Sequence, residues 1–373
     1  MNNLLNQDFR KELLRTDVIP RKLNEVSQKY KELLLKDLED KVIKTEIVEK
    51  CQCGSENLEE LTKIDRFGLP FGSLICRDCG LVITSPRISQ ESLPYYYDKY
   101  YHPLNYGKEH LENQNALFAD GQGKKIFTIL KDFLPNKERI TILEIGAGTG
   151  NVLFEFKEEA KRENILVEEL GTEYSQDCID KCKEKSINSI FGNIQTVLEL
   201  NKKFDVIILS HVFEHFIDLN KELEDLKKLM TDETLLYIEV PGILVNHKKS
   251  YYDFSFLGYL VHAHMYNFTL NSLNKVMELN GLNYIQINEN IEGVFKINLK
   301  SKHKNREEEY IKINNYFKQY HDAYSFLEIG IKDLKDLKEE FIEKQKVMIA
   351  NRDKLISQKE EFIEKQKVMI ENR

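Results

Sequence analysis

Residues 144–150, Glu-Ile-Gly-Ala-Gly-Thr-Gly, combine a carboxylate with three glycines at alternate positions. They directly follow the apolar run 140–143, a pattern typical of a strand that ends in a tight turn. Glycine tolerates the backbone angles of such a turn, and it lets a ligand lie against bare backbone. The turn also aims the N–H groups of a helix N-terminus at negative charge. The segment therefore predicts a site for a nucleoside-like ligand that is anionic or carboxylated.

Further polar residues follow the next three strands expected along the chain. Glu173 ends the second strand, where a carboxylate can accept both hydroxyls of a ribose. Asn193 follows the third strand and is placed to contact an adenine edge. Ser210 and His211 end the fourth strand and open the run His-Val-Phe-Glu-His. Because the carboxyl ends of parallel strands share one edge of a sheet, we expect these residues around one pocket.

Four cysteines form two close pairs, Cys51 with Cys53 and Cys76 with Cys79, and a glycine follows each pair. Two such pairs suit tetrahedral Zn²⁺. The first pair is C-x-C, because Lys50 stands where a C-x-x-C ligand would be, so it stays open whether this pair completes the site. A closed site of four cysteines would be structural and would contribute folding energy to a segment with little core of its own.

Strand and helix patterns alternate from about residue 121, which is typical of a parallel α/β sheet. The expected strands lie near 140–145, 165–172, 187–191, 204–210 and 234–240, and the expected helices near 150–162, 175–185, 194–200, 218–230 and 270–280. The runs 282–287 and 293–299 are close enough in sequence to be an antiparallel pair that finishes the sheet. We therefore predict an α/β Rossmann-like fold, with a parallel sheet that holds one antiparallel strand.

The whole chain divides into five segments by composition. These are a helical leader (1–47), a zinc-ribbon-like domain (48–90), an aromatic connector or cap (91–120), the α/β domain (121–300) and a helical tail (301–373). In the leader, one helix face is expected to hold Leu23, Val26, Tyr30, Leu33 and Leu34. The tyrosine-rich run 94–106 could either cover a pocket or pack the cysteine segment onto its neighbour.

The tail carries an apolar residue at every seventh position, which is the pattern of a coiled coil. These residues are Leu327, Leu334, Phe341, Met348, Leu355, Phe362 and Met369. The other core position is polar, so a solvated helix without a partner stays an alternative. As a coiled coil, residues 327–373 would join copies of the chain or bind an assembly partner.

Composition limits the classes of function. The chain has 373 residues and a net charge of −8, which argues against broad nucleic-acid binding. It has no apolar run near the roughly 20 residues that a membrane-spanning helix needs. Its first residues lack the pattern of a signal peptide, and cysteines in such a chain are expected to be reduced or metal-bound. A cytoplasmic protein is the simplest interpretation.

Three motifs in order identify a resemblance: Leu-Glu-Ile-Gly-Ala-Gly-Thr-Gly at 143–150, His-Val-Phe-Glu-His at 211–215, and His-Met-Tyr-Asn-Phe-Thr-Leu-Asn-Ser-Leu at 264–273. Residues 121–300 resemble the class I S-adenosylmethionine-dependent methyltransferases, which would make this a methyltransferase. The resemblance implies that the glycine turn borders the methionine part of the cofactor, that Glu173 holds the ribose, and that Asn193 lies near the adenine. The implied cofactor-binding set is Glu144, Gly146, Gly148, Gly150, Glu173, Asn193, Ser210 and His211.

Methyl transfer from a sulfonium is an in-line displacement, in which the enzyme aligns the acceptor and removes a proton where needed. Histidine suits the second task because its pKa is near neutrality. His264 is the first candidate base, since its segment usually faces the acceptor, and His211 is the second. His215 and His262 are rivals, and each of the four could instead be a hydrogen-bonded structural histidine.

Residues 76–87, followed by the tyrosines of 95–101, resemble the zinc-ribbon leader of bacterial methyltransferases that act on sugars and surface glycans. Sugar C-methyltransferases also carry a second large domain where this chain has a charged helix, which argues against that subfamily. The leading prediction is methyl transfer to a hydroxyl of a sugar or nucleotide-linked sugar in polysaccharide biosynthesis. The alternatives are an RNA methyltransferase with a zinc-ribbon recognition module and a non-enzymatic coiled-coil scaffold. The sequence leaves open whether O, N or C is methylated.

Overall fold

A computed structural model describes residues 13–18, 20–107, 121–248, 256–288, 290–297, 310–313, 315–316 and 359. Residues 1–315 form one compact unit and residues 316–373 a second. The predicted coiled coil at 327–373 lies outside the described residues, apart from residue 359. No helix within the described ranges is long and apolar enough to cross a membrane.

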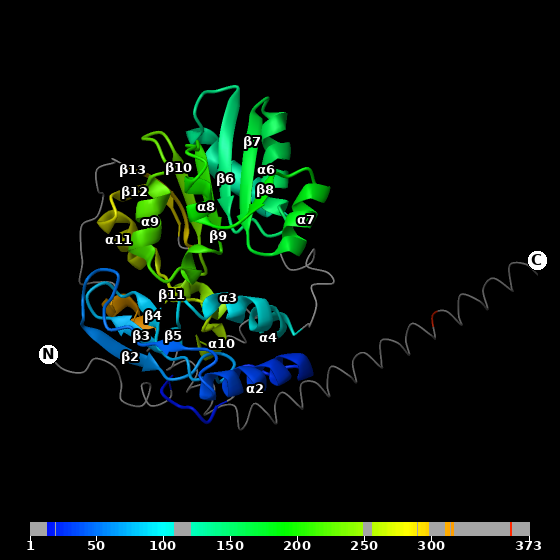
Figure 1. The fold of residues 1–373 in the computed structure, drawn as a ribbon. Helices are drawn as coiled ribbons and strands as arrows, with labels where there is room; N and C mark the ends of the chain where they lie inside the picture. The colour runs from blue at the N-terminus through cyan, green and yellow to red at the C-terminus, as the bar shows by residue number, and fades with distance from the viewer. Residues whose placement is uncertain are drawn as a thin grey trace, which may run out of the picture. The chain divides into compact units, whose positions relative to one another are not determined.

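A seven-stranded sheet forms the centre of the first unit, in the order β12-β13-β10-β9-β6-β7-β8 (Figure 1). Its strands are β6 (Arg139–Ile145), β7 (Leu166–Glu173), β8 (Ser189–Phe191), β9 (Val206–Ser210), β10 (Leu235–Glu239), β12 (Leu282–Ile287) and β13 (Glu292–Ile297). Strand β13 runs antiparallel to both of its neighbours, whereas the pairs among β6 to β10 are parallel. The prediction of a Rossmann-like sheet with one antiparallel strand is confirmed.

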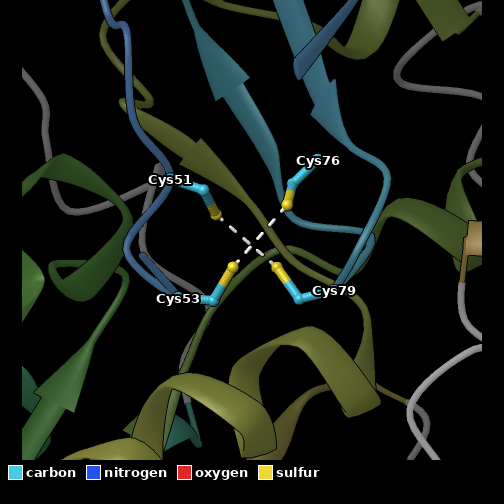
Figure 2. Close-up of side chains that lie close together, drawn as sticks. All are labelled: Cys51, Cys53, Cys76 and Cys79. Atoms are coloured by element: carbon cyan, nitrogen blue, oxygen red, sulfur yellow. Dashed lines mark hydrogen bonds between the residues drawn. The ribbon is translucent and has the colours of Figure 1, made fainter. Parts of the chain in front are cut away.

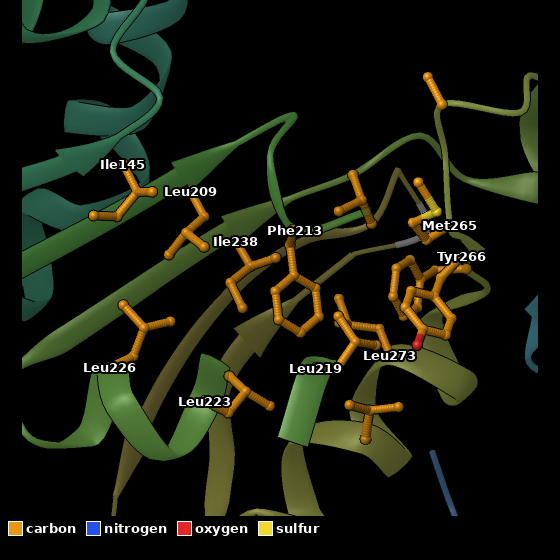
Figure 3. Packing of buried hydrophobic residues seen from close by; sticks show 14 of the residues in the cluster. Ile145, Leu209, Phe213, Leu219, Leu223, Leu226, Ile238, Met265, Tyr266 and Leu273 are labelled. Atoms are coloured by element: carbon orange, nitrogen blue, oxygen red, sulfur yellow. The ribbon is translucent and has the colours of Figure 1, made fainter. Parts of the chain in front are cut away.

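Helices cover both faces of this sheet, because its strands are apolar on both sides. The helices are α5 (Gln122–Leu130), α6 (Asn151–Arg162), α7 (Gln176–Glu184), α8 (Ile194–Leu198), α9 (Leu219–Lys227) and α11 (Leu270–Leu279), with short 3₁₀ turns at Lys131–Phe133, Phe213–His215 and Ile243–Lys248. One core holds Ile142 and Ile208 with α5 and α6, and the other holds Leu143 and Leu209 with α8, α9 and α11. Figure 3 shows part of the second core, where Leu223 and Leu226 of α9 lie beside Leu209 and Ile238 of the sheet. Alternate residues of each strand therefore serve opposite layers.

The cysteine-bearing segment forms a smaller antiparallel sheet of four strands, in the order β11-β4-β3-β2. Strands β2 (Leu58–Thr62), β3 (Ser73–Cys76) and β4 (Val82–Thr84) come from this segment, but β11 (Tyr266–Asn267) comes from the α/β domain. Strands β1 (Thr45–Glu46), before β2, and β5 (Arg87–Ile88), after β4, pair with each other in a separate antiparallel sheet. Buried residues of this segment belong to the same core as Leu143 and Leu209.

The remaining helical segments are α2 (Glu25–Glu39), α3 (Leu93–Tyr96), a π-helical turn (Tyr97–Tyr101), α4 (His102–Tyr106) and α10 (Phe256–Tyr259). In the leader helix α2, Leu34 is fully buried but Leu33 is 37% exposed. The two leucines were predicted to share one helix face, but only Leu34 belongs to the core, because adjacent positions of a helix point about 100° apart. Tyr96 and Tyr100 of the aromatic run are fully buried in the larger core.

The joint between the two sheets fixes the backbone at His264. The Thr84 hydroxyl donates to the His264 carbonyl at 2.6 Å. The Thr84 N–H donates to the Met265 carbonyl at 3.0 Å. Next to it, Ile83 pairs with Tyr266 in the antiparallel ladder. The cysteine-bearing sheet therefore holds the loop in which the first candidate base stands.

Replacing Thr84 by valine tests this joint. The change removes the hydroxyl and leaves the partly buried His264 carbonyl without that donor, so we expect a loss of about 1–3 kcal/mol in the free energy of unfolding. Thr62→Val is the matched control, because Thr62 is 1% exposed and its hydroxyl has no hydrogen-bond partner within the described ranges. Urea unfolding followed by circular dichroism measures both variants. Equal midpoints for T84V and T62V would contradict the role of this contact.

Candidate active site

The glycine turn follows β6 and leads into α6, as the sequence predicts. Gly146, Gly148 and Gly150 all have positive φ, with values of 69°, 53° and 77°. A Cβ on Gly150 would approach Cys182 Sγ to 2.9 Å, whereas a Cβ on Gly148 would meet nothing within 4 Å. Gly150 is thus required by packing and Gly148 by its backbone angles alone. The backbone beside Gly148 is open to a ligand.

Glu173, at the end of β7, binds the glycine turn from the side. Its Oε2 accepts from the Gly148 N–H at 2.9 Å, and its Oε1 accepts from Tyr174 N–H at 2.8 Å and Ser175 N–H at 3.1 Å. The carboxylate therefore connects the turn to the residues that precede α7. Oε1 already accepts two hydrogen bonds, whereas Oε2 accepts one, so Oε2 has a further lone pair that can accept from a ribose hydroxyl.

Glu144 stands at the end of β6 with its side chain buried, and it is 2% exposed. Its Oε2 has no hydrogen-bond partner among the residues that the structure describes. Burial, with the nearby charge of Glu173, raises the pKa of Glu144 well above its usual range. A buried acceptor without a donor fits a ligand that brings its own N–H groups, such as the ammonium of a methionine.

Asn193 is used by the protein itself at the start of α8. Its side chain accepts from the Gln195 and Thr196 N–H groups in a capping box. Two aromatic side chains lie close by, Tyr174 and Phe191, which are 63% and 59% exposed with ring centroids 5.9 Å apart. Exposed rings at the carboxyl ends of β7 and β8 offer a stacking surface to a planar base. Asn193 therefore shapes this corner as a helix cap.

Ser210 and His211 end β9, beside Glu239 at the end of β10. Gln122, at the start of α5, hydrogen-bonds to both Ser210 and Glu239. Glu239 also accepts from Lys125 at 2.8 Å. Although burial raises the pKa of Glu239, His211 and Lys125 lower it to about 2. Glu239 is therefore a carboxylate at neutral pH.

His211 adopts a positive φ of 57° and lies between two carboxylates. Its Nε2 is 3.6 Å from Glu239 Oε1, and its Nδ1 is 3.8 Å from Glu214 Oε1. Although surrounding atoms that exclude water lower the pKa of His211, the two carboxylates raise it to about 10. A histidine that already carries its proton at neutral pH is a poor proton acceptor, so this geometry disfavours His211 as the base.

His264 is mostly buried and neutral. Burial first, and then neighbouring positive charge, lowers the pKa of His264 well below its usual range. Its Nε2 lies 3.9 Å from Glu214 Oε1, and its ring meets the His215 ring edge to face with centroids 4.9 Å apart. The run at 211–215 also reaches the glycine turn, since a Cβ on Gly146 would come within 2.6 Å of Val212. The histidines and the turn therefore belong to one edge of the sheet.

The rival His262 lies apart from this cluster. Its Nδ1 is 2.6 Å from Asp65 Oδ2, and its ring stacks on Phe71 with centroids 4.7 Å apart. It is fully buried among residues of the cysteine-bearing segment. A buried, paired and stacked imidazole of this kind is structural.

The side chains of all four predicted cysteine ligands point toward one another (Figure 2). The C-x-C pair Cys51 and Cys53 is therefore placed to complete the group. Cys51 Sγ and Cys79 Sγ are 3.5 Å apart, and Cys53 Sγ and Cys76 Sγ are 3.7 Å apart. Four thiolates about 2.3 Å from a tetrahedral Zn²⁺ would be roughly 3.8 Å from one another, so the spacing fits that ion. Both pairs share one backbone pattern, because the Gly54 N–H donates to the Cys51 carbonyl and the Gly80 N–H to the Cys76 carbonyl.

Sequence reasoning missed three residues of this edge: Gln122, Tyr97 and Glu239. Glu239 ends a predicted strand, so its position at the carboxyl edge could have been noticed. Gln122 begins α5, a helix that was not predicted, and carries no motif, and Tyr97 is one of many tyrosines in its run. Their roles depend on tertiary contacts that no local pattern reveals.

Residues 118–287 match a protein family described as "Methyltransferase domain". Together with the sheet order and the glycine turn, this match defines a class I S-adenosylmethionine-dependent methyltransferase domain, and the chain is accordingly a methyltransferase. The match covers less than half of the chain. A comparison with curated proteins finds no match.

Solved structures that match part of this chain share little sequence with it. The plantazolicin methyltransferase BamL, solved with S-adenosylhomocysteine, has 18% identity and a TM-score of 0.38 over 55% of this chain and 77% of its own. The CurJ carbon methyltransferase has 18% identity and a TM-score of 0.39 over 52% of this chain and 59% of its own. The YcgJ protein from Bacillus has 18% identity and a TM-score of 0.33 over 44% of this chain and 71% of its own.

Glu173→Gln tests the proposed ribose contact. Hydrogen bonds to a charged group contribute about 1.5–3 kcal/mol, so we expect the Kd for S-adenosylhomocysteine to rise roughly 10- to 100-fold in calorimetry. The wild type should also bind the 2′-deoxy analogue more weakly than S-adenosylhomocysteine, and the variant should bind the two alike.

Glu168→Gln is the control, because this side chain is on the same strand and 52% exposed. A Glu173→Gln protein that still discriminates against the deoxy analogue would show that Glu173 only supports the turn.

Proposed function

We propose that this protein transfers a methyl group from S-adenosylmethionine to a hydroxyl of a sugar or nucleotide-linked sugar, in the cytoplasm, during the synthesis of a surface glycan. The observation that carries the hydroxyl chemistry is the neutral, mostly buried imidazole of His264 beside the carboxylate of Glu214. A hydroxyl must lose its proton to become a good nucleophile, and a neutral imidazole can accept one.

The cofactor would lie along the carboxyl edge of β6, β7 and β9. In this proposal its ammonium meets the orphan oxygen of Glu144, and its methionine part lies over the open backbone at Gly148. Its ribose meets Glu173, and its adenine lies against Tyr174 near Asn193. Ser210 and His211 would form the floor, with His211 as a fixed positive charge.

The sugar as acceptor is supported by the resemblance of residues 76–87 and 95–101 to the leader of glycan-directed methyltransferases. The four-cysteine cluster fits a structural Zn²⁺, and the same ion would make residues 48–90 a zinc ribbon. Residues 327–373 are proposed to oligomerise the enzyme or to bind an assembly partner.

The test of this proposal is turnover. The full chain, with S-adenosylmethionine and a panel of nucleotide-linked sugars, should yield S-adenosylhomocysteine and a sugar heavier by one methyl group in mass spectrometry. His264→Asn should lower kcat about 10²- to 10⁴-fold while the Kd for S-adenosylhomocysteine stays within a factor of two. Methylation of RNA but of no sugar would favour the alternative enzyme, and failure to bind the cofactor would reject both.

Cys76→Ser tests the zinc proposal. We expect mass spectrometry to find one equivalent of zinc in the wild type and none in the purified variant, and we expect the variant to unfold at a lower temperature, because ion binding contributes to folding. Cys178→Ser is the matched control, since Cys178 is buried but stands outside the cluster. Equal zinc content in the two variants would reject a Cys₄ site.

A further inference from the structure

A second group of ligand-type side chains lies at the carboxyl edge of the large sheet, apart from the four cysteines. One ligand atom each from Glu214, His215 and His264 lies within 4.8 Å of the other two. Glu214 and His215 belong to the 3₁₀ turn after β9, and His264 belongs to the loop before β11. Two separate segments of the chain thus bring two imidazoles and one carboxylate to one point.

The hydrogen bonds of His215 fix which of its nitrogens faces this point. Its Nδ1 lies 2.8 Å from the Ala263 carbonyl, and a carbonyl can only accept, so Nδ1 carries the proton. The Tyr97 hydroxyl lies 3.2 Å from the same nitrogen. His215 Nε2 therefore presents a lone pair toward Glu214. Donation of the outer N–H to a carbonyl is the usual arrangement of a metal-ligating histidine.

The distances within the group are too long for hydrogen bonds but suit ligands of a shared ion. Glu214 Oε1 is 3.9 Å from His215 Nε2 and also 3.9 Å from His264 Nε2. Ligand atoms about 2.1 Å from one cation are roughly 3.0–3.4 Å apart at tetrahedral or octahedral angles. Each ligand atom would have to move inward by a few tenths of an ångström to bring these separations to those of ligands around one ion.

The protonated His211 lies 3.8 Å from Glu214 Oε1, but the other oxygen of Glu214 gives a further reason to expect a cation. Its side chain is 2% exposed, and its Oε2 has no hydrogen-bond partner in the part of the chain that the structure describes. A buried carboxylate oxygen without a donor is costly unless a cation or a donor meets it. The backbone of His264 is held by Thr84, so this ligand is positioned before any ion arrives.

We propose that Glu214, His215 and His264 bind one divalent first-row transition-metal ion at the acceptor side of the methyl-transfer site. Two imidazoles and one carboxylate are a ligand set used by such ions, and three protein ligands leave positions open for substrate oxygens. In this proposal His264 is a ligand through Nε2, and the ion replaces His264 as the group that promotes loss of the acceptor's proton.

This proposal deepens the proposed function, on which its chemical consequence rests. An acceptor hydroxyl bound to the ion has a lowered pKa and releases its proton to water. The oxygen then forms a bond to the methyl carbon, and the carbon–sulfur bond breaks with its electron pair going to sulfur, which leaves S-adenosylhomocysteine. A vicinal diol of a sugar can occupy two open positions of the ion, so acceptors with adjacent hydroxyls are the preferred class.

Mn²⁺ is the probe, because its electron paramagnetic resonance signal reports the free ion and it prefers oxygen and nitrogen to the thiolates of the cysteine cluster. The zinc-loaded full chain, without cofactor or acceptor, should bind one equivalent. Glu214→Gln and His215→Asn should each weaken binding more than about 100-fold, beyond the 10- to 100-fold typical of residues that only orient ligands. His102→Asn is the matched control, since His102 is a partly buried histidine outside the group and should bind Mn²⁺ as the wild type does.

Calorimetry with S-adenosylhomocysteine accompanies each variant and shows whether it is folded. Loss of Mn²⁺ binding with cofactor binding retained supports the site. No Mn²⁺ binding by the wild type, or equal binding by Glu214→Gln and the wild type, overturns it. Because Mn²⁺ is measured without cofactor, failure of the wild type to bind S-adenosylhomocysteine would reject the proposed function and leave the result on the metal site standing.

Discussion

Carboxyl groups held out of water at one edge of the large sheet are the constraint on which the site depends. Glu144, Glu214 and Glu239 are each at most 8% exposed, and Glu173 stands beside the first of them. Glu239 is compensated by Lys125 and His211, and Glu173 by backbone N–H groups. Glu144 and Glu214 each keep an oxygen without a donor in the described structure. The edge is therefore built for cationic ligands, and a sulfonium cofactor with an ammonium group is one.

Much of this architecture could be predicted from the sequence, for physical reasons. The strands β6 to β10 were predictable because each is a short apolar run between polar turns, and the turn at 144–150 because only glycine tolerates its backbone angles. The convergence of the four cysteines followed from their paired spacing. These features depend on residues close together in the chain.

Other parts depended on contacts between distant residues and could not be predicted. The protonation of His211 is set by Glu239, which comes from another strand. The choice between His264 and His262 depended on Asp65, nearly 200 positions earlier, which pairs with His262 (|i−j| = 197). Which leucine of α2 faces the core depended on how the helix packs, and there the sequence pattern was wrong about Leu33. A histidine alone does not show whether it will be a base, a ligand or part of the core.

The sheet shared by the two parts of the chain has a consequence for synthesis. Strand β4 ends at Thr84, but its partner β11 begins only at Tyr266. During translation, β4 must keep an unpaired edge until that later segment has left the ribosome, while the thiols near it can already gather. The cysteine-bearing segment can thus begin to fold early, but it acquires its last strand only after strands β6 to β10 have been made, so its edge pairs at the same stage as the loop of His264 is fixed.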